Sequence, residues 1–288
     1  MMKLKIGTRK SALALAQTKM VEHQLKKAFP SLETELVCIS TKGDRILDRS
    51  LASFGGKGVF VSEIESRLLS GEIDIAVHSA KDLPTELMDG LEISAVLPRG
   101  DHRDVLVTKK GTSRFQKGFV TGTGSMRRRV NFAAVCPDAV FKEIRGNIDT
   151  RLKKLLNDEY DGIILAAAGL ERLGFDRDDR FDLEYFDGCS SFLPSPCQGI
   201  IAVESRRNDA AASLVKAVND ENTFAAFETE RCLIQYLNGG CGVPLGAYAY
   251  VKDGKIWIAA SKDGKKIVRT GAAIEERMEC VRELIKCL

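Results

Sequence analysis

The sequence has little of what metal centres, membranes and nucleic acids require. Its 288 residues include three histidines and eight cysteines, none of them in a CxxC pair, so the sequence predicts no metal site. The longest apolar run, residues 162–170, is far shorter than the ~20 residues of a membrane-spanning helix. Basic and acidic residues number 43 and 40, without the basic excess that is typical of nucleic-acid-binding proteins.

The amino-terminal residues do not form a signal-peptide pattern, because the apolar stretch 12–16 is short and ends in polar residues. We therefore expect a cytoplasmic protein without a membrane partner. Its cysteines should be reduced and mostly buried, as small apolar side chains. A hydrophobic fraction of 44% is typical of a globular protein, and the length predicts two domains or three small ones.

Short apolar runs alternate with helical patterns over the first two-thirds of the chain. The predicted helices are residues 11–28 with Ser11 as cap, a short one that contains a Ser62–Glu65 capping box, and 125–135, 150–156 and 210–218. The predicted strands are 3–7, 35–40, 73–77, 93–97, 105–108, 139–144, 162–166 and 199–203. This alternation predicts parallel sheets covered by helices, with ligands at the loops beyond the strand C-termini.

The last quarter of the chain has a different pattern. A helix over 222–237 is followed by predicted hairpin strands 247–251, 256–260 and 266–270, with Asp-Gly turns at 253–254 and 263–264. A final helix is expected over 273–287. The pattern indicates a small α+β domain.

The segment 78–84, His-Ser-Ala-Lys-Asp-Leu-Pro, directly follows the predicted strand 73–77. It therefore lies at a strand C-terminus, where α/β sheets carry functional loops. Asp82 stands beside Lys81 and two residues before Pro84, which prevents a helix from continuing. The segment is a candidate catalytic loop, and the alternative is a polar turn with a solvated aspartate.

A second group is rich in arginine. Arg127, Arg128 and Arg129 follow the Gly/Ser/Thr loop 121–125, and Arg145 and Arg151 come shortly after. Such a loop offers N–H groups and a helix dipole to an anion, and guanidinium groups bind carboxylates or phosphates with two hydrogen bonds. The group predicts a site for a polyanionic small molecule. The alternative is a solvated basic face.

A third feature is Cys241, which lies among four glycines and a proline in residues 239–246. This composition indicates a tight, exposed loop, and exposure makes thiolate chemistry accessible. The alternative is a loop cysteine without a role.

In their order and spacing, these segments resemble the porphobilinogen deaminase family over nearly the whole chain. The motifs that carry the resemblance are residues 7–14, 56–60, 78–84, 145–152, 166–170 and the Cys241 loop. The resemblance implies an α/β fold, with two domains resembling type II periplasmic binding proteins plus a small C-terminal α+β domain. The implied domains are 1–97 with 197–217, then 98–196, and then 218–288, which carries the cofactor-attachment loop.

The resemblance also implies an activity. Four porphobilinogen molecules would be condensed head to tail with loss of ammonia, and hydrolysis would then release hydroxymethylbilane for tetrapyrrole synthesis. The enzyme would be a transferase, working as a monomer on a dipyrromethane primer joined to Cys241 by a thioether. Asp82 would be the catalytic residue, because one carboxyl group can serve several proton steps and stabilise a developing cation.

The remaining site residues follow from the same resemblance. The residues implied to bind the cofactor are Ser79, Lys81, Asp44, Thr123, Ser125, Arg127, Arg128 and Arg145. The residues implied to bind the substrate are Arg9, Ser11, Gln17, Arg151 and Gln198. Each pyrrole carries an acetate and a propionate, so the growing chain is a polycarboxylate that arginine side chains suit.

Three other interpretations stay open at this point. A non-catalytic anion-binding module would account for the arginines, although not for Asp82 together with the Cys241 loop. An inactive relative would keep the fold without the activity. A nucleic-acid-binding protein is the least supported, because the charges are balanced and the basic group lacks interleaved aromatic residues.

Overall fold

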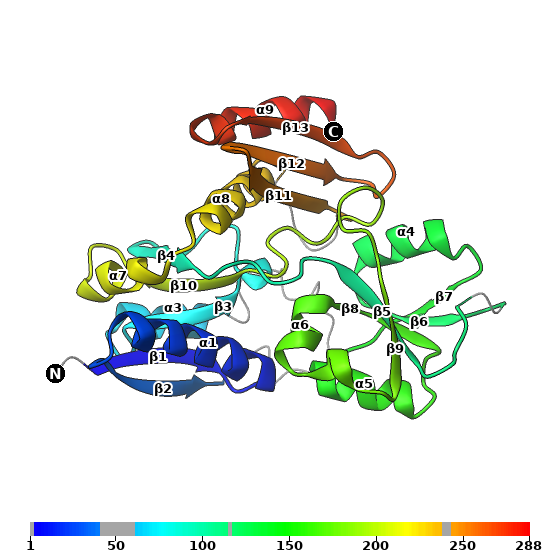
Figure 1. Ribbon diagram of the computed structural model, residues 1–288, viewed down its shortest axis with the longest axis horizontal. Helices are drawn as coiled ribbons and strands as arrows, with labels where there is room; N and C mark the ends of the chain where they lie inside the picture. Colours follow the sequence, from blue (N-terminus) through cyan, green and yellow to red (C-terminus); the bar gives the residue numbers. More distant parts are fainter. Residues whose placement is uncertain (1–2, 41–60, 115–116, 238–242) are drawn as a thin grey trace. The chain divides into compact units, whose positions relative to one another are not determined.

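The computed structural model describes residues 3–40, 61–114, 117–237 and 243–288 (Figure 1). The chain divides into two compact units. Unit 1 contains residues 1–99 and 200–227, and unit 2 contains residues 100–199 and 228–288. The finer division into three domains with the boundaries given above stays a prediction.

Unit 1 is built on a five-stranded sheet of order β2-β1-β3-β10-β4. The strands are β1 (Lys3–Arg9), β2 (Glu33–Ile39), β3 (Ile75–Ser79), β4 (Leu91–Val96) and β10 (Ile201–Arg206). β1 runs parallel to β2 and β3, whereas β10 is antiparallel to both of its neighbours. The unit's α-helices are α1 (Ala12–Ala28), α3 (Ser62–Leu69) and α7 (Ala210–Val215), followed by the 3-10 turn η4 (Lys216–Val218).

Unit 2 contains a second five-stranded sheet, of order β7-β6-β8-β5-β9. The strands are β5 (Asp104–Lys109), β6 (Val120–Gly122), β7 (Val140–Lys142), β8 (Gly162–Ala166) and β9 (Phe181–Tyr185). Here β6 runs parallel to β7 and β8, and β5 is antiparallel to β8 and β9. The helices are α4 (Met126–Val135), α5 (Ile148–Leu156) and α6 (Ala167–Arg172), with the 3-10 turn η3 (Phe175–Arg177).

The two sheets have the same topology. In each sheet, three parallel strands are followed by an antiparallel one, β10 in unit 1 and β5 in unit 2. Each of these two is the first strand in the sequence after the chain has crossed from the other unit. The predicted parallel pairing is therefore found among three strands of each sheet, and it is wrong for β10 and β5, which are antiparallel to their neighbours. The α/β class is confirmed: each unit contains a five-stranded sheet with helices, and a three-stranded antiparallel sheet with a helix forms the C-terminal α+β part.

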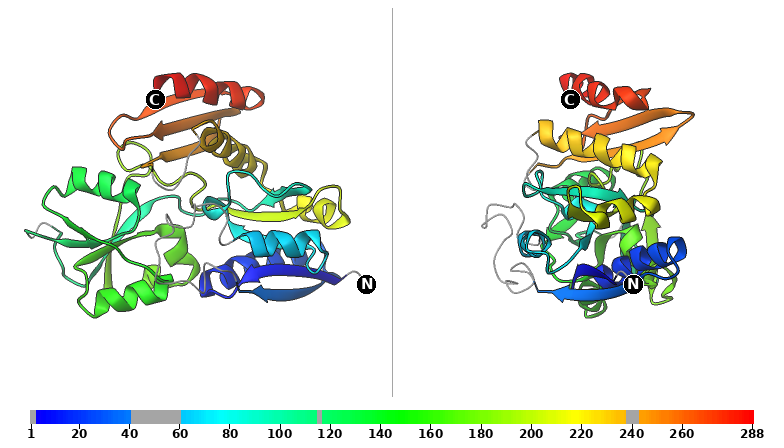
Figure 2. Two further views of the ribbon diagram at one scale, coloured as in Figure 1. Left: turned by 180° about the vertical axis from the view of Figure 1, so that it is seen from behind. Right: turned by 90° about the vertical axis from the view of Figure 1, so that its left-hand side faces the viewer.

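The C-terminal part of unit 2 follows helix α8 (Glu221–Tyr236), which runs across the boundary between the units. The antiparallel strands β11 (Gly246–Lys252), β12 (Lys255–Ser261) and β13 (Val268–Ala273) lead through the 3-10 turn η5 (Ile274–Glu276) into α9 (Arg277–Cys287). α9 packs along β13, as both views in Figure 2 show. The buried Glu230 of α8 accepts the backbone N–H of Ala249 at 2.6 Å and that of Cys197.

Local sequence explains where several helices begin. Ser11 caps α1 by accepting the Ala14 N–H at 3.2 Å, as predicted. The predicted capping box at Ser62 is wrong: α3 starts at Ser62 itself, and its N-cap, Val61, makes no side-chain cap bond.

The sequence did not predict β6, β9 or α6, which have three, five and six residues.

The cores are apolar, as expected. Of the seven described cysteines, Cys136, Cys197, Cys232 and Cys280 are buried, and Cys38, Cys189 and Cys287 are exposed. None of the helices in the described part of the chain is long and apolar enough to cross a lipid bilayer.

The segments that pass between the units contain a close backbone contact within unit 2. Gly199 has a φ of +87°, and a Cβ there would lie 2.6 Å from the Gly100 carbonyl oxygen. The Gly100 N–H donates to the Gly199 carbonyl at 3.1 Å, and Arg172 Nη2 donates to the same oxygen at 2.6 Å. Burial lowers the pKa of the Arg172 guanidinium to about 10.

We predict that Gly199→Ala destabilises the protein by roughly 2 kcal/mol or more, from backbone strain together with the contact to Gly100. Gly111→Ala is the matched control, because Gly111 has a φ of +78° and no atom near its missing Cβ. Urea denaturation should place the midpoint of the Gly199 variant clearly below that of the control. Equal midpoints would show that the contact contributes nothing.

Candidate functional site

Several predicted site residues of unit 1 meet at the carboxyl edge of its sheet. Arg9 ends β1 and Ser79 ends β3, and these strands run parallel as direct neighbours. Lys81 and Asp82 follow in the 3-10 turn η2 (Ala80–Asp82). Asp82 is exposed and Lys81 is half-buried. The turn thus presents a carboxylate and an ammonium group side by side in the sequence at the edge of the sheet.

The geometry of η2 follows from its sequence. The Leu83 N–H closes the turn on the Ala80 carbonyl at 3.3 Å. Leu83 then takes an extended conformation, with φ −65° and ψ 143°, as is usual before a proline. The Ala80 N–H donates to the Ile200 carbonyl at 3.0 Å, which ties the start of the turn to the segment that enters β10. Asp82 therefore stands on a short turn that is fixed at both ends.

Gln17 and Ser79 form a pair behind this turn. The Gln17 Nε2 donates to Ser79 Oγ at 2.8 Å, and Ser79 Oγ lies 3.1 Å from Gln17 Oε1. Gln17 is buried, and the Ser11 hydroxyl is engaged as the cap of α1. The structure therefore brings Arg9, Ser11, Gln17, Ser79 and Asp82 to one edge. Asp44 lies outside the described residues.

A buried ionisable group lies one residue before Ser79. His78 Nε2 is 2.9 Å from Glu204 Oε2 of β10, and both side chains are almost fully enclosed. Glu65 of α3 is also buried, and burial raises the pKa of its carboxyl. The contact between His78 and Glu204 joins the side chains of the neighbouring strands β3 and β10, just before the turn that carries Asp82.

Unit 2 places its predicted residues at the equivalent edge. The loop 123–125 connects β6 to α4, and Ser125 caps α4 by accepting the Arg128 N–H at 3.4 Å. The buried Thr123 accepts the Ser125 N–H at 3.2 Å, and its own N–H donates to the Lys142 carbonyl at 3.0 Å. The loop and the end of β7 are thereby joined.

Arg127 and Arg128 point inward and share one carboxylate, that of Asp104 at the start of β5. Arg127 Nη1 donates to Asp104 Oδ2 at 2.6 Å, and Arg128 Nη2 donates to Oδ1 at 2.7 Å. Asp104 is fully buried, and the side chains of the two arginines are only 5% and 10% exposed. Two positive charges against one negative charge leave a local surplus of one positive charge.

Asp104 and Arg127 influence each other's pKa, and Arg128 also acts on the pKa of Asp104. Burial alone would raise the pKa of the Asp104 carboxyl, but the charges of Arg127 and Arg128, with hydrogen bonds from Arg127 and Gln198, hold it well below its usual range. Burial lowers the pKa of the Arg127 guanidinium, against the attraction of Asp104. Asp104 is therefore ionised in the folded protein at neutral pH.

Gln198 is completely buried and supports the same carboxylate. Its Nε2 lies 3.1 Å from Asp104 Oδ1 and 2.9 Å from the His102 carbonyl oxygen. Asp104 and Gln198 thus belong to one network with the two arginines. Sequence reasoning missed Asp104, because its partners follow it by more than twenty residues and no local pattern connects them.

Arg145 and Arg151 complete the edge. Arg145 Nη2 donates to the exposed Glu143 at 2.6 Å, and Arg151 Nε donates to the Gly146 carbonyl at 2.7 Å. The backbone beside Arg145 also approaches the loop 123–125: a Cβ on Gly124 would lie 3.8 Å from the Ile144 carbonyl oxygen. Thr123, Ser125, Arg127, Arg128, Arg145 and Arg151 therefore come from adjacent segments of one edge.

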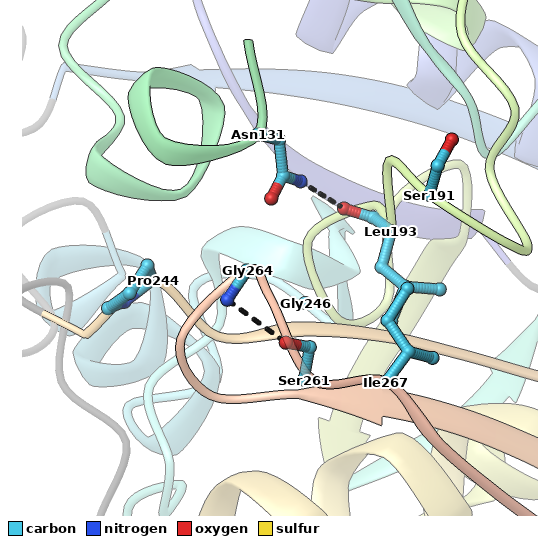
Figure 3. Close-up of a pocket in the computed structure, with 8 residues that line it drawn as sticks. All are labelled: Asn131, Ser191, Leu193, Pro244, Gly246, Ser261, Gly264 and Ile267. Carbon is cyan, nitrogen blue, oxygen red and sulfur yellow. Dashed lines mark hydrogen bonds between the residues drawn. The ribbon is translucent and has the colours of Figure 1, made fainter. Parts of the chain in front are cut away.

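A close-packed crevice joins this edge to the C-terminal sheet (Figure 3). Asn131 of α4 donates to the Leu193 carbonyl at 3.4 Å, and the same oxygen accepts from Arg127 Nη1 at 2.6 Å. Pro244 lines the crevice with Asn131, and it comes three residues after Cys241 in the sequence. Cys241 itself lies outside the described residues. Within the described ranges, no three histidine, cysteine or carboxylate side chains form a group that could hold a metal ion.

Two family profiles match the chain. The profile for the porphobilinogen deaminase dipyrromethane cofactor binding domain covers residues 4–213. The profile for the porphobilinogen deaminase C-terminal domain covers residues 224–288.

Curated relatives agree over most of their length. A porphobilinogen deaminase of Geobacillus kaustophilus is 48% identical over 276 residues, which are 93% of this chain and 88% of the relative. One of Oceanobacillus iheyensis is 41% identical and covers 100% of this chain and 94% of the relative. Among solved structures, the VFT2 domain of Bordetella pertussis BvgS aligns with 82% of this chain and 92% of its own, at 15% identity and a TM-score of 0.45.

We predict that Asp104→Asn lowers the free energy of unfolding at neutral pH by about 3–5 kcal/mol, because two buried guanidinium groups lose their counter-charge. The low folded pKa of Asp104 adds stability above the pKa of an unfolded aspartate, and this stability is lost as the pH falls. The difference from the wild type should therefore narrow below about pH 4.

Chemical denaturation of both proteins between pH 3 and pH 8 measures this difference. Asp178→Asn is the control, because Asp178 also pairs with an arginine, Arg180, whose side chain is 57% exposed to solvent. A gap that stays constant over the whole pH range would contradict the assignment of the charge to Asp104.

Proposed function

The chain belongs to the porphobilinogen deaminase family, and on this premise we propose how its residues perform the reaction. The enzyme condenses porphobilinogen molecules head to tail with loss of ammonia and releases hydroxymethylbilane. The observation that carries the assignment of roles is the surplus positive charge of Arg127 and Arg128 over Asp104, at the N-terminus of α4. This charge suits a ligand that carries several carboxylates.

The dipyrromethane cofactor fits this edge of unit 2. Its carboxylates would meet guanidinium N–H groups, the hydroxyl of Ser125 and the N-terminus of α4. When bound, it supplies the pyrrole carbon to which the first substrate is joined. We assign Thr123, Ser125, Arg127, Arg128 and Arg145 to its binding from unit 2, and Ser79, Lys81 and Asp44 from unit 1. Cys241 is the residue that we propose for its attachment, because a thiolate is a strong nucleophile.

Arg145 can change partners when the ligand binds. Its present partner, Glu143, has a side chain that is 53% exposed, so their ion pair contributes little to stability. A ligand carboxylate can therefore replace Glu143 at small cost. We therefore assign Arg145 to direct contact with a ligand carboxylate, and Arg127 and Arg128 to binding through the positive charge that they hold beside it.

The substrate role is assigned to Arg9, Ser11, Gln17, Arg151 and Gln198. Arg9 and Arg151 would bind the acetate and propionate groups of porphobilinogen. The Ser11 hydroxyl already accepts the Ala14 N–H. We therefore assign Ser11 an indirect role, in which it fixes the start of α1 so that the N–H groups there can bind a substrate carboxylate. The burial of Gln198 supports a role through Asp104 rather than by direct contact.

Asp82 is the group that we assign to the proton steps. Each condensation breaks a C–N bond, releases ammonia, forms a C–C bond and removes one proton from a pyrrole carbon. A carboxylate beside the reacting carbon stabilises the positive charge that develops as the C–N bond breaks. The same carboxylate can accept the proton after the C–C bond has formed. Its exposure at the end of η2 leaves it accessible to substrate.

We also propose that the enzyme acts as a monomer in the cytoplasm, without a nucleic-acid or membrane partner. The family resemblance supports the monomer, and the balance of 43 basic against 40 acidic residues supports the absence of a nucleic-acid partner.

We predict that Asp82→Asn lowers the turnover number by about 100-fold or more, since it removes the proton-accepting group but keeps the shape of the side chain. Thermal unfolding should be unchanged, because Asp82 is exposed. Asp89→Asn is the matched control, an exposed aspartate seven residues further on. Ammonia release from porphobilinogen measures the rate, and a near-normal rate for Asp82→Asn would remove Asp82 from the mechanism.

We predict that the denatured wild-type protein carries an added mass that matches a dipyrromethane. Cys241→Ser should lack this mass, because a serine hydroxyl is too weak a nucleophile to replace the thiolate. Intact-protein mass spectrometry, before and after incubation with porphobilinogen, makes the comparison, with Cys189→Ser as the control for loss of an exposed thiol. An added mass that persists in Cys241→Ser would place the attachment elsewhere.

A further inference from the structure

The two faces of the C-terminal sheet of unit 2 differ in character. One face packs against α9 and contains Ile256, Ile258 and Ala260, all buried. The other face carries Tyr248 and Tyr250 of β11 and Trp257 of β12, because side chains alternate along a strand. Tyr250 and Trp257 are each 39% exposed. Large aromatic side chains on an open sheet face indicate a binding surface.

The strand register creates a hollow on this face. Tyr248 pairs with Ala259, and Ala259 pairs with Arg269 of β13. In the next row Tyr250 pairs with Trp257. The small Ala259 side chain is thus the floor between larger neighbours, and the resulting pocket has a volume of about 250 Å³. We call it the aromatic pocket, lined by Tyr248, Tyr250, Trp257, Ala259 and Arg269, with Cys189 at its rim.

The aromatic rings of the pocket are held in place. The Tyr248 ring stacks on Tyr250 at 5.5 Å and on His102 at 3.7 Å, the latter with an interplanar angle of 12°. Gly271 leaves room for the Trp257 indole, since a Cβ at that position would lie 2.6 Å from Trp257 Cε3. The walls are therefore preorganised, and ligand binding would cost little conformational entropy of these side chains.

Arg269 provides a cation at the edge of the aromatic pocket. Its Nη2 donates to the Cys189 carbonyl at 3.0 Å, which fixes the guanidinium beside the hollow. In the described part of the chain no carboxylate forms an ion pair with Arg269. The pocket thus combines flat apolar walls with one uncompensated positive charge.

We propose that the aromatic pocket binds a small planar aromatic carboxylate. The ring would lie against the aromatic walls, and the carboxylate would bind the guanidinium of Arg269. A volume of about 250 Å³ lies just below the roughly 300–1,000 Å³ of pockets for drug-sized ligands, so one ring or two fused rings fit and a four-ring chain does not. None of the residues assigned to the reaction lines this pocket, so the proposal does not depend on the proposed function.

Trp257 makes the test local, because it is the only tryptophan in the sequence. The full-length protein is labelled with 5-fluorotryptophan, and its single ¹⁹F resonance is followed during titration with pyrrole-2-carboxylate. Two comparison probes are pyrrole-2-carboxamide, which is planar but neutral, and cyclohexanecarboxylate, which is anionic but not planar. We expect a saturable shift with pyrrole-2-carboxylate and affinities at least about tenfold weaker for both comparison probes.

Arg269→Gln should reduce the affinity for pyrrole-2-carboxylate to that of the amide, while the amide itself binds as it does to the wild type. Arg282→Gln is the matched control, since it removes the same charge from α9, where Arg282 contacts Tyr236 and Glu279. This control should bind all three probes like the wild type.

Three results would overturn the proposal. The first is a resonance that none of the probes shifts. The second is equal affinity of the wild type for the acid and its amide. The third is a resonance that moves with protein concentration and is insensitive to the probes, with a dimer in sedimentation velocity, because a second copy of the chain would then occupy the surface.

Discussion

The buried contact of Asp104 with Arg127 and Arg128 is the interaction on which the site of unit 2 depends. It connects the first strand after the chain enters this unit to α4, and Arg128 Nη1 extends it to the Ile164 carbonyl of β8 at 2.8 Å. Buried ions are costly unless they are paired and fully hydrogen-bonded. One carboxylate cannot compensate two guanidinium groups, so one positive charge stays without a counter-charge in this contact, and the proposed anionic ligand would supply one.

The repeated topology places a buried carboxylate on the equivalent strand of each unit. β10 in unit 1 and β5 in unit 2 hold equivalent places in their sheets. β10 carries Glu204, which pairs with His78, and β5 carries Asp104. The carboxyl edges beside them differ in chemistry: unit 1 offers the exposed carboxylate of Asp82, and unit 2 offers guanidinium groups. The same topology thus carries a carboxylate at the edge of one sheet and guanidinium groups at the edge of the other.

The sequence predicted those parts that depend on local pattern. Ser11 and Ser125 were both identified as helix starts, because an N-cap acts within three residues. The antiparallel direction of β10 could not be predicted, since it rests on pairs such as Ser79 with Ile201 that are far apart in the chain. The sequence did not predict strand β6, because it has only three residues and ends in Gly122, whose missing side chain makes room for Tyr160. The positions of Asp82 and of the arginines followed from motifs, whereas the burial of Gln198 needed the fold.

The arginine run 127–129 illustrates how composition and fold can give different impressions. As a sequence it is typical of a solvated basic face, and the overall charge of +3 shows no excess. In the fold, successive helical residues point about 100° apart, so two of the three side chains turn inward to Asp104 and Arg129 donates to the Thr123 carbonyl at 3.2 Å. A balanced total therefore conceals a local surplus. This local surplus is enclosed where water screens it little, and it supports the binding of a small polycarboxylate that we propose for this edge.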